Sequence, residues 1–422
     1  MRRFKILYAV PGLIVALCAA ATWAVDVRET VSEEWRAYIE PLLDDGEELV
    51  NLLDQPQDGL LRQELYRFMF SEISAYYIAL LHTSPAYPEF RPSNNEAYNF
   101  GYPNPDDVYL GAWVEGDGIY RISGYRGTVR IMDLALAGGA LHPTGSGELG
   151  PTFANYNFDS LSLNENGYFE VVVSQERPEG YAGDWWKLDP AASYFVVRQR
   201  MYDLNSEIDG RLAIERLDLP AVRPRATAQE IETQLKALTR TTTGWVRYAI
   251  EHINNLRKDD LVNRVRVRTL NQFGGVSYQH YIEGVFDISA DEALILETEV
   301  PETCRYWNFQ LSDFLWRTVG WMHSQSSVNG YTARLDGDGK FRAVIASSDP
   351  GVPNWLDTTG YLRGLIYGRW TGCSSQPVPK VTRVKLENVR EYLPADTPLI
   401  SPEQRDAAIR RHREGVQLRH KW

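Results

Sequence analysis

The run Asp349–Trp370, DPGVPNWLDTTGYLRGLIYGRW, combines two prolines, four glycines, two tryptophans, two aspartates and two arginines. Proline fixes φ and glycine permits positive φ, so the first six residues predict a shaped loop. Polar side chains that can take part in chemistry lie on this loop and after it, at Asp349, Asn354, Asp357 and Arg369. We therefore expect the rest of the chain to be a scaffold that presents the loop.

Strand signals surround this loop. Short segments rich in β-branched and aromatic residues alternate with Gly-Asp, Asn-Gly and Gly-Gly turns in two regions, 84–220 and 261–422. The pattern predicts a mainly β fold with helical additions (α+β), built from antiparallel sheets in a β-sandwich or jelly-roll-like arrangement. The DPGVPNWLDT box belongs to the second region, where Ser401 and Gln404 around Pro402 predict a C-terminal helix.

Helical patterns precede and separate the two strand-rich regions. Residues 29–82 form a helical segment that breaks at Pro56, and its second half is apolar on nearly every side, which predicts burial. Residues 221–260 predict a helical connector. Within it, Thr227 and Glu230 form a capping box at the start of a helix that runs to about residue 255.

The first 24 residues have the pattern of a targeting segment. A basic start, MRRFK, precedes an almost wholly apolar run that ends in Thr22-Trp23-Ala24. Cleavage after Ala21 or Ala24 gives a periplasmic or secreted protein. The alternative is an uncleaved anchor that tethers the protein to the inner membrane, facing the periplasm, because the run is nearly long enough to span a bilayer.

Charge and aromatic content narrow the classes of partner. The chain has 56 acidic and 44 basic residues and a net charge of −12, which argues against nucleic acid and against anionic membrane surfaces as partners. It also has 24 tyrosines and 12 tryptophans, residues that line pockets for flat or apolar ligands as well as filling cores. We expect a small-molecule ligand or substrate.

The cysteines suggest one covalent link. After removal of the targeting segment only Cys304 and Cys373 remain. Two cysteines in an exported protein favour a disulfide, here one that closes a loop of about 70 residues. The alternative is two free buried thiols.

Familiar cofactor motifs do not occur in the sequence. It contains no HExxH, no paired CxxC, no GxGxxG and no Walker loop, and no nucleophile signature surrounds its serines. We therefore expect neither a metal nor any other cofactor.

A polar strand face predicts the substrate-binding surface. In an extended segment, Tyr306, Asn308 and Gln310 lie on one face, opposite Trp307 and Phe309. We expect substrate contacts from the three residues of the polar face and from further polar and aromatic residues, namely Asn329, Asn354, Trp355, Arg369, Tyr98 and Asn104.

Three residues are candidates for catalysis. Asp349 and Asp357 form a general acid/base pair if burial raises the pKa of one of them, and His323 is the third candidate. In the alternative interpretation, each aspartate is a turn residue that accepts a hydrogen bond from its own backbone.

Three blocks resemble a known family. They are residues 104–130, residues 306–318 (YWNFQLSDFLWRT) and residues 327–370, which include the DPGVPNWLDT box. Together these blocks resemble the bacterial domain-of-unknown-function family twelve-fourteen. The resemblance implies a β-sandwich-like fold and implies no particular reaction.

Three functional hypotheses follow from the sequence. The first is an exported enzyme, a hydrolase, lyase or isomerase, that acts on an apolar or aromatic small molecule by cofactor-independent acid/base chemistry. The second is a non-catalytic periplasmic ligand-binding protein with the same aromatic surroundings. The third is a carbohydrate-active hydrolase or lyase with tryptophan platforms and two carboxylates flanking a glycosidic bond.

Overall fold

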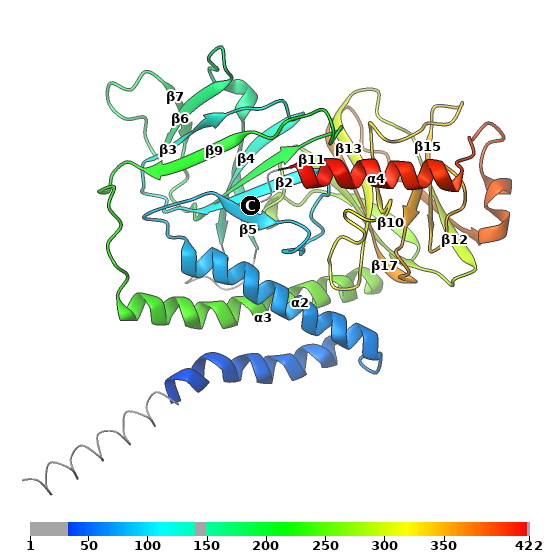
Figure 1. Cartoon of the computed structure of the whole chain (residues 1–422), viewed down its shortest axis with the longest axis horizontal. Helices are drawn as coiled ribbons and strands as arrows, with labels where there is room; N and C mark the ends of the chain where they lie inside the picture. Colours follow the sequence, from blue (N-terminus) through cyan, green and yellow to red (C-terminus); the bar gives the residue numbers. More distant parts are fainter. Residues whose placement is uncertain (1–32, 140–148, 420–422) are drawn as a thin grey trace, which may run out of the picture.

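The computed structural model describes residues 33–139 and 149–419 (Figure 1). The predicted targeting segment, residues 1–24, lies outside them. Within the described ranges no helix is long and apolar enough to cross a membrane. Export and anchoring therefore stay predictions of the sequence.

The first half of the strands forms two facing sheets. One sheet has the order β1 (Arg91–Asn94), β2 (Asp107–Trp113), β8 (Tyr194–Arg200), β4 (Ile131–Gly139), β5 (Leu149–Asn157), with every pair antiparallel. The other has the order β7 (Asp184–Lys187), β6 (Tyr168–Ser174), β3 (Tyr120–Tyr125), β9 (Arg211–Arg216), in which β6 and β7 are parallel. Leu134 and Phe195 from one sheet pack against Tyr120 and Val171 from the other.

The second half repeats this arrangement. One sheet has the order β10 (Arg264–Arg268), β11 (Gln279–Asp287), β17 (Arg363–Cys373), β13 (Cys304–Ser312), β14 (Ser327–Asn329). The other has the order β16 (Trp355–Asp357), β15 (Phe341–Ala346), β12 (Glu292–Thr298), β18 (Lys380–Lys385). Phe309 and Trp370 of the first pack with Leu294 and Phe341 of the second. The predicted mainly β, α+β fold is thus confirmed as two sandwiches with added helices.

Two helices cover one side of both sandwiches (Figure 1). After a helix at residues 33–52, α2 (Gly59–Tyr77) begins at Asp58, whose carboxylate accepts hydrogen bonds from two backbone N–H groups. A π-helical turn, Ile78–His82, follows it. The connector helix α3 (Ala228–Lys258) begins with the predicted capping box of Thr227 and Glu230 and packs against α2.

The predicted burial of α2 applies to one side only. Leu65 and Phe68 are fully buried against α3 and the second sandwich. Leu60 and Phe70, by contrast, are each 71% exposed. The all-round apolar pattern therefore overstated how much of this helix is covered.

The last helix, α4 (Pro402–Leu418), bridges the two sandwiches. It begins with the predicted capping box, in which the Ser401 hydroxyl accepts from Gln404 N–H and the Gln404 side chain accepts from Ser401 N–H. Val416, near its end, lies in the core of the first sandwich. Arg405, near its start, contacts the loop that precedes β16 in the second sandwich.

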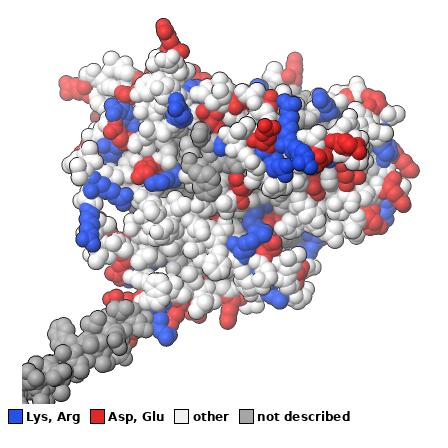
Figure 2. All heavy atoms as spheres, viewed as in Figure 1, with Lys and Arg blue, Asp and Glu red and all other residues white. Residues whose placement is uncertain are grey.

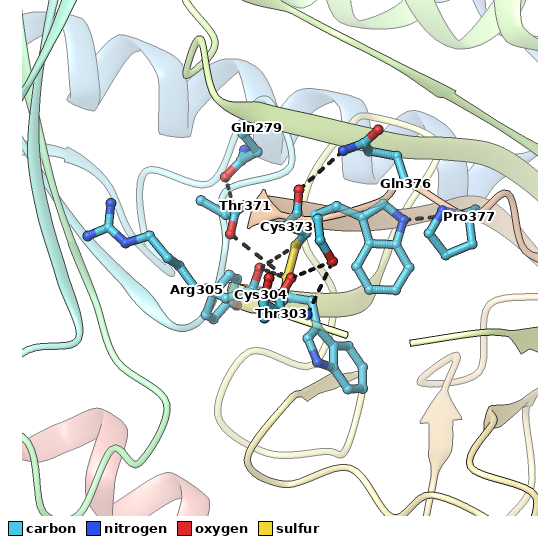
Figure 3. The surroundings of a disulfide bond; sticks show 12 residues. Gln279, Thr303, Cys304, Arg305, Thr371, Cys373, Gln376 and Pro377 are labelled. Carbon is cyan, nitrogen blue, oxygen red and sulfur yellow. Dashed lines mark hydrogen bonds between the residues drawn. A yellow bond between two sulfur atoms is a disulfide. The ribbon is translucent and has the colours of Figure 1, made fainter. Parts of the chain in front are cut away.

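Cys304 and Cys373 form the predicted disulfide (Figure 3). They are opposed residues of the neighbouring strands β13 and β17. Beside the bond, the Thr371 hydroxyl donates to the side-chain oxygen of Gln279 on β11, so three strands are connected here by side chains as well as by the backbone ladder.

We expect the disulfide to stabilise the fold through the loop that it closes. Its sequence separation of 69 residues corresponds to about 4 kcal/mol in the chain-entropy model. Replacing both cysteines by serine should lower the free energy of unfolding by about that amount in urea titrations, and reducing the wild-type protein should have the same effect. An unchanged midpoint in both samples would contradict this expectation.

Candidate functional site

The loop of the DPGVPNWLDT box is held by one arginine of α4. Arg405 is 5% exposed, and its Nε donates to Asp349 Oδ2 at 2.9 Å. Its terminal nitrogens donate to the carbonyl oxygens of Val352 and Pro353. The loop keeps its shape because the buried Arg405 guanidinium donates hydrogen bonds to the loop's carboxylate and carbonyl oxygens.

The candidate catalytic aspartates both make turns with their own backbone. Asp349 Oδ1 accepts from Gly351 N–H at 2.8 Å, and Asp357 Oδ1 accepts from Thr359 N–H at 2.7 Å. Burial raises the pKa of the Asp357 carboxyl above its usual value, and the nearby negative charge of Asp349 adds to the effect. Both aspartates thus have the turn role that the sequence left open, and Asp357 also has the raised pKa that an acid/base role needs.

The other box residues and His323 have different surroundings. The Asn354 side-chain amide donates to the carbonyl oxygens of Arg334 and Arg342, at 2.6 and 2.8 Å, and so joins the loop to β15. The Trp355 indole N–H donates to the carbonyl oxygen of Ala346. His323 lies exposed in the turn before β14.

Most of the remaining candidates meet in one buried network between the sandwiches. Asn308 Nδ2 donates to Asn104 Oδ1 at 3.1 Å, and the Tyr306 hydroxyl donates to Asp106 at 2.6 Å. Gln310 accepts from Arg369 at 2.6 Å. The polar face of β13 predicted from the sequence therefore exists, and it packs on the loop before β2.

Two candidates lie at the edges of this network. Asn329 on β14 donates to the Asp106 carboxylate at 2.9 Å. Asn329 also borders a cavity of about 510 Å³ between β14 and α4. Arg411 and His412 of α4 line this cavity as well. Tyr98 is buried in the loop that precedes β2, where its backbone N–H bonds to Asn95.

A bidentate ion pair lies at the centre of the junction. Arg200 on β8 donates to both carboxylate oxygens of Asp107 on β2, at 2.6 and 2.7 Å. Its third nitrogen donates across to Gln279 and Thr371 of the second sandwich, at 2.9 and 3.0 Å. Both charged residues are buried, so each depends on the other for compensation.

A cavity of about 210 Å³ opens beside this junction. It lies between α2 and the first sheet, and the turn at 270–275 from the second sandwich forms part of its wall. Nine of its lining residues are aromatic, namely Tyr76, Phe100, Tyr102, Tyr109, Trp113, Tyr194, Phe273, Tyr281 and Trp316. Among the described lining residues there are four arginines, Arg91, Arg198, Arg200 and Arg369, and a single carboxylate, Glu72.

Several polar atoms on this cavity's wall are buried without a hydrogen-bond partner in the described part of the chain. They are both carboxylate oxygens of Glu72, the Tyr76 hydroxyl, Arg91 Nε, Asn94 Oδ1 and Arg198 Nη1. Each unsatisfied buried group costs about 1–3 kcal/mol, and native structures contain few of them. A group of five residues around one cavity therefore indicates a ligand site.

Glu72 is the most perturbed of these residues. Its side chain is fully buried, and burial raises the pKa of its carboxyl to about 8, while the positive charge of Arg317 opposes the shift. Glu72 is therefore mostly protonated at neutral pH. The π-helical turn that follows α2 places Ala79 in the same wall, and such irregular turns are frequent at functional sites.

Glycine at position 111 shapes the opposite wall. A Cβ there would lie 1.7 Å from the Tyr194 hydroxyl, so only glycine lets the tyrosine lie across strand β2. Trp113 lies two residues after Gly111 on β2. Its indole N–H donates to the Ala79 carbonyl at 2.5 Å and so connects β2 to the π-helical turn.

Glu72 was not among the residues predicted from the sequence. The residue had one available signal, because it continues the buried spacing of Leu65, Phe68 and Met69 along α2, where a carboxylate is rarely found. Arg198 gave no comparable signal, since arginines on strands usually pair with exposed acids.

Surface charge is mixed in sign. Figure 2 shows acidic and basic side chains interspersed over the face in view, without a continuous basic stripe. Within the described residues, no group of three or more His, Cys, Asp or Glu side chains could hold a metal ion.

Two solved structures resemble this chain to different degrees. An uncharacterised protein from Burkholderia cenocepacia is 26% identical, covers 85% of this chain and 98% of its own length, and superposes with a TM-score of 0.78. A protein from Vibrio parahaemolyticus is 12% identical, covers 79% of this chain and 100% of its own, and gives a TM-score of 0.44. No protein-family model and no curated protein matches the chain, so the family resemblance stays a prediction.

Removing the arginine that holds the box loop should destabilise the protein. Arg405→Leu deletes the ion pair with Asp349 and leaves the Val352 carbonyl without its donor, at a cost of about 2–4 kcal/mol in the free energy of unfolding. The matched control is Arg410→Leu on the same helix, which removes an exposed pair and should cost less than about 1 kcal/mol. Equal losses in the two variants would refute the anchoring role.

The raised pKa of Glu72 predicts a pH-dependent stability. Because the folded-state pKa of about 8 exceeds the ordinary value of 4.5, the stabilising protonation is fully present below pH 4.5 and is lost as the pH rises through 8. Glu72→Gln should therefore match the wild type near pH 4.5 and exceed its free energy of unfolding at pH 9 by roughly 3–5 kcal/mol. Urea titrations at the two pH values measure the difference.

The control for this comparison is Glu251→Gln, an exposed position on α3. Its urea titrations at the same two pH values give the effect of removing an exposed carboxylate. A pH-dependent gain for Glu72→Gln no larger than that of this control would contradict the raised pKa of Glu72.

Proposed function

We propose that the cavity under α2 is the active site of an exported enzyme that acts on an apolar or aromatic small molecule by cofactor-independent acid/base chemistry. One observation carries the proposal: Glu72, fully buried on the cavity wall, has no hydrogen-bond partner among the described residues. Aromatic rings around it supply the apolar surface that such a substrate needs.

Glu72 has the properties of a general acid/base. A carboxyl with a pKa near 8 holds a proton at neutral pH and can donate it to a bound substrate, then recover it. The Tyr76 hydroxyl, one turn further along α2, is close enough for the charge of Glu72 to raise its pKa, although burial is the larger cause. Together the two groups supply a proton donor and a second hydrogen-bonding group to one region of the cavity.

A non-catalytic binding protein is the second candidate. The observation in its favour is that Glu72 is the single carboxylate among the described lining residues. The cavity therefore offers no second carboxylate from these residues to act as the base while Glu72 acts as the acid. The same count gives no support to a glycosidase in this cavity, because that chemistry uses two carboxylates about 5–10 Å apart. The pair Asp349 and Asp357 stays a competing prediction for the catalytic groups.

The decisive experiment begins with the ligand. Native mass spectrometry of the protein purified from its own compartment identifies a co-purifying molecule, and incubation then shows whether the protein converts it. Glu72→Gln should bind the molecule and lose turnover by about 10²-fold or more, the scale of a lost general acid/base.

Two controls separate the alternatives. Asp357→Asn should retain the turnover of the wild type if Glu72 is the acid/base. Wild-type turnover in Glu72→Gln, together with its loss in Asp357→Asn, would move the active site to the box loop. A bound molecule that stays unchanged through long incubation would identify a binding protein.

A further inference from the structure

Arg198 on β8 has an incomplete set of partners. Its Nη2 donates to the Gly274 carbonyl at 3.2 Å, while its Nη1 is buried without an acceptor in the described chain. The guanidinium lies 6.0 Å from the Tyr109 ring. No carboxylate in residues 33–139 or 149–419 forms an ion pair with it. The nearest compensation that the structure shows is longer-range, from Asp107 and from Asp133, which is opposed to Arg198 on β4.

Arg369 adds a second buried cation to the same wall. It is 3% exposed and donates only to neutral oxygens, those of Gln310, Asn308 and the Tyr102 backbone. The described residues place no carboxylate within ion-pair distance of it. A buried guanidinium without an anion is expensive, which leaves the cavity favourable for a negative charge.

The charge balance of the lining points in the same direction. Two of its four arginines are paired, Arg200 with Asp107 and Arg91 with Glu89. Arg198 and Arg369 are not paired within the described ranges. Glu72, the one lining carboxylate there, is mostly protonated at neutral pH and so offers little compensation. The cavity wall is thus net positive.

Strand register shows where an anion would lie. Across β1, β2 and β8, Asn94, Tyr109 and Arg198 are opposed in one row. Asn94 and Arg198 therefore flank the Tyr109 ring, and each contributes an unpartnered atom. A group bound at Arg198 would have the Tyr109 ring on one side. On the other side of Arg198 the row continues to Asp133 on β4, which is outside the cavity lining and accepts a hydrogen bond from the Tyr278 hydroxyl.

The cavity also limits the size of the ligand. Its volume is about 210 Å³. For comparison, an engineered apolar cavity of about 150 Å³ binds benzene. The space therefore suits one ring, or a short chain, with one small polar group.

We propose that the ligand of this cavity is a small apolar carboxylic acid, bound as its anion at Arg198 with its ring or chain against the aromatic walls. The carboxylate accepts from Arg198 Nη1, the strongest kind of hydrogen bond that this wall can offer. The inference rests on the proposed ligand site and goes beyond it by specifying the chemical class of the ligand.

The wild-type protein provides the first test. Benzoate and phenylacetate are titrated into it beside benzamide, phenylacetamide and benzyl alcohol, with calorimetry and the fluorescence of Trp113 and Trp316 as readouts. The carboxylates should bind at least about tenfold more tightly than the amides of the same shape. Amides or alcohol that bind equally well or better would overturn the acid class and leave the ligand site standing. Failure of all five compounds to bind would overturn both.

The second test uses variants. Arg198→Gln should weaken benzoate binding by about tenfold or more and leave benzyl alcohol binding unchanged, while Arg198→Lys should retain part of the benzoate affinity. Arg121→Gln on β3, a half-buried arginine outside the cavity lining, is the matched control and should bind benzoate as the wild type does. Unaltered benzoate affinity in Arg198→Gln would overturn the proposal. If circular dichroism shows that Arg198→Gln is unfolded, the wild-type comparison decides.

Discussion

The bidentate pair between Arg200 and Asp107 fixes how the two sandwiches meet. Both residues belong to the first sandwich, yet the remaining nitrogen of the guanidinium reaches Gln279 and Thr371 of the second. A planar guanidinium has a fixed set of donor directions, so the pair fixes the relative position of the two sandwiches as well as stabilising their contact. The cavity lies next to this junction, and Arg200 is part of its wall. The geometry of the candidate site therefore depends on how the halves are joined.

Several buried polar side chains at the junction are hydrogen-bonded, whereas several on the cavity wall have no partner among the described residues. Asn104, Tyr306, Asn308, Gln310 and Arg369 are buried and hydrogen-bonded to one another or to the backbone, as buried polar groups require. On the cavity wall, Glu72 and Arg198 keep unpartnered atoms. Unpartnered buried atoms also occur elsewhere in the described chain, but the five residues gathered around this one cavity are the strongest reason to associate it with function.

Local chemistry explains what the sequence could predict. Hairpin turns, the capping boxes at Thr227 and Ser401, and the disulfide between Cys304 and Cys373 depend on residues whose partners follow from short-range rules or from elimination. The alternation of Tyr306, Asn308 and Gln310 also predicted a shared polar face. What that face would meet was not predictable, because the loop before β2 is some 200 residues away in the chain. Glu72 was missed for the same reason, since its isolation is a property of the assembled walls.

The C-terminal helix has a consequence for the order of folding. Arg405 holds the box loop of the second sandwich, while Arg419, just past the end of α4, donates to Asp209 and to the backbone of Asp106 in the first. The contact between residues 106 and 419 spans 313 positions, and such non-local contacts form slowly. Each sandwich has a hydrophobic core of its own. The helix adds its contacts to those that Arg200 makes between the two halves, so we expect it to be among the last elements to dock.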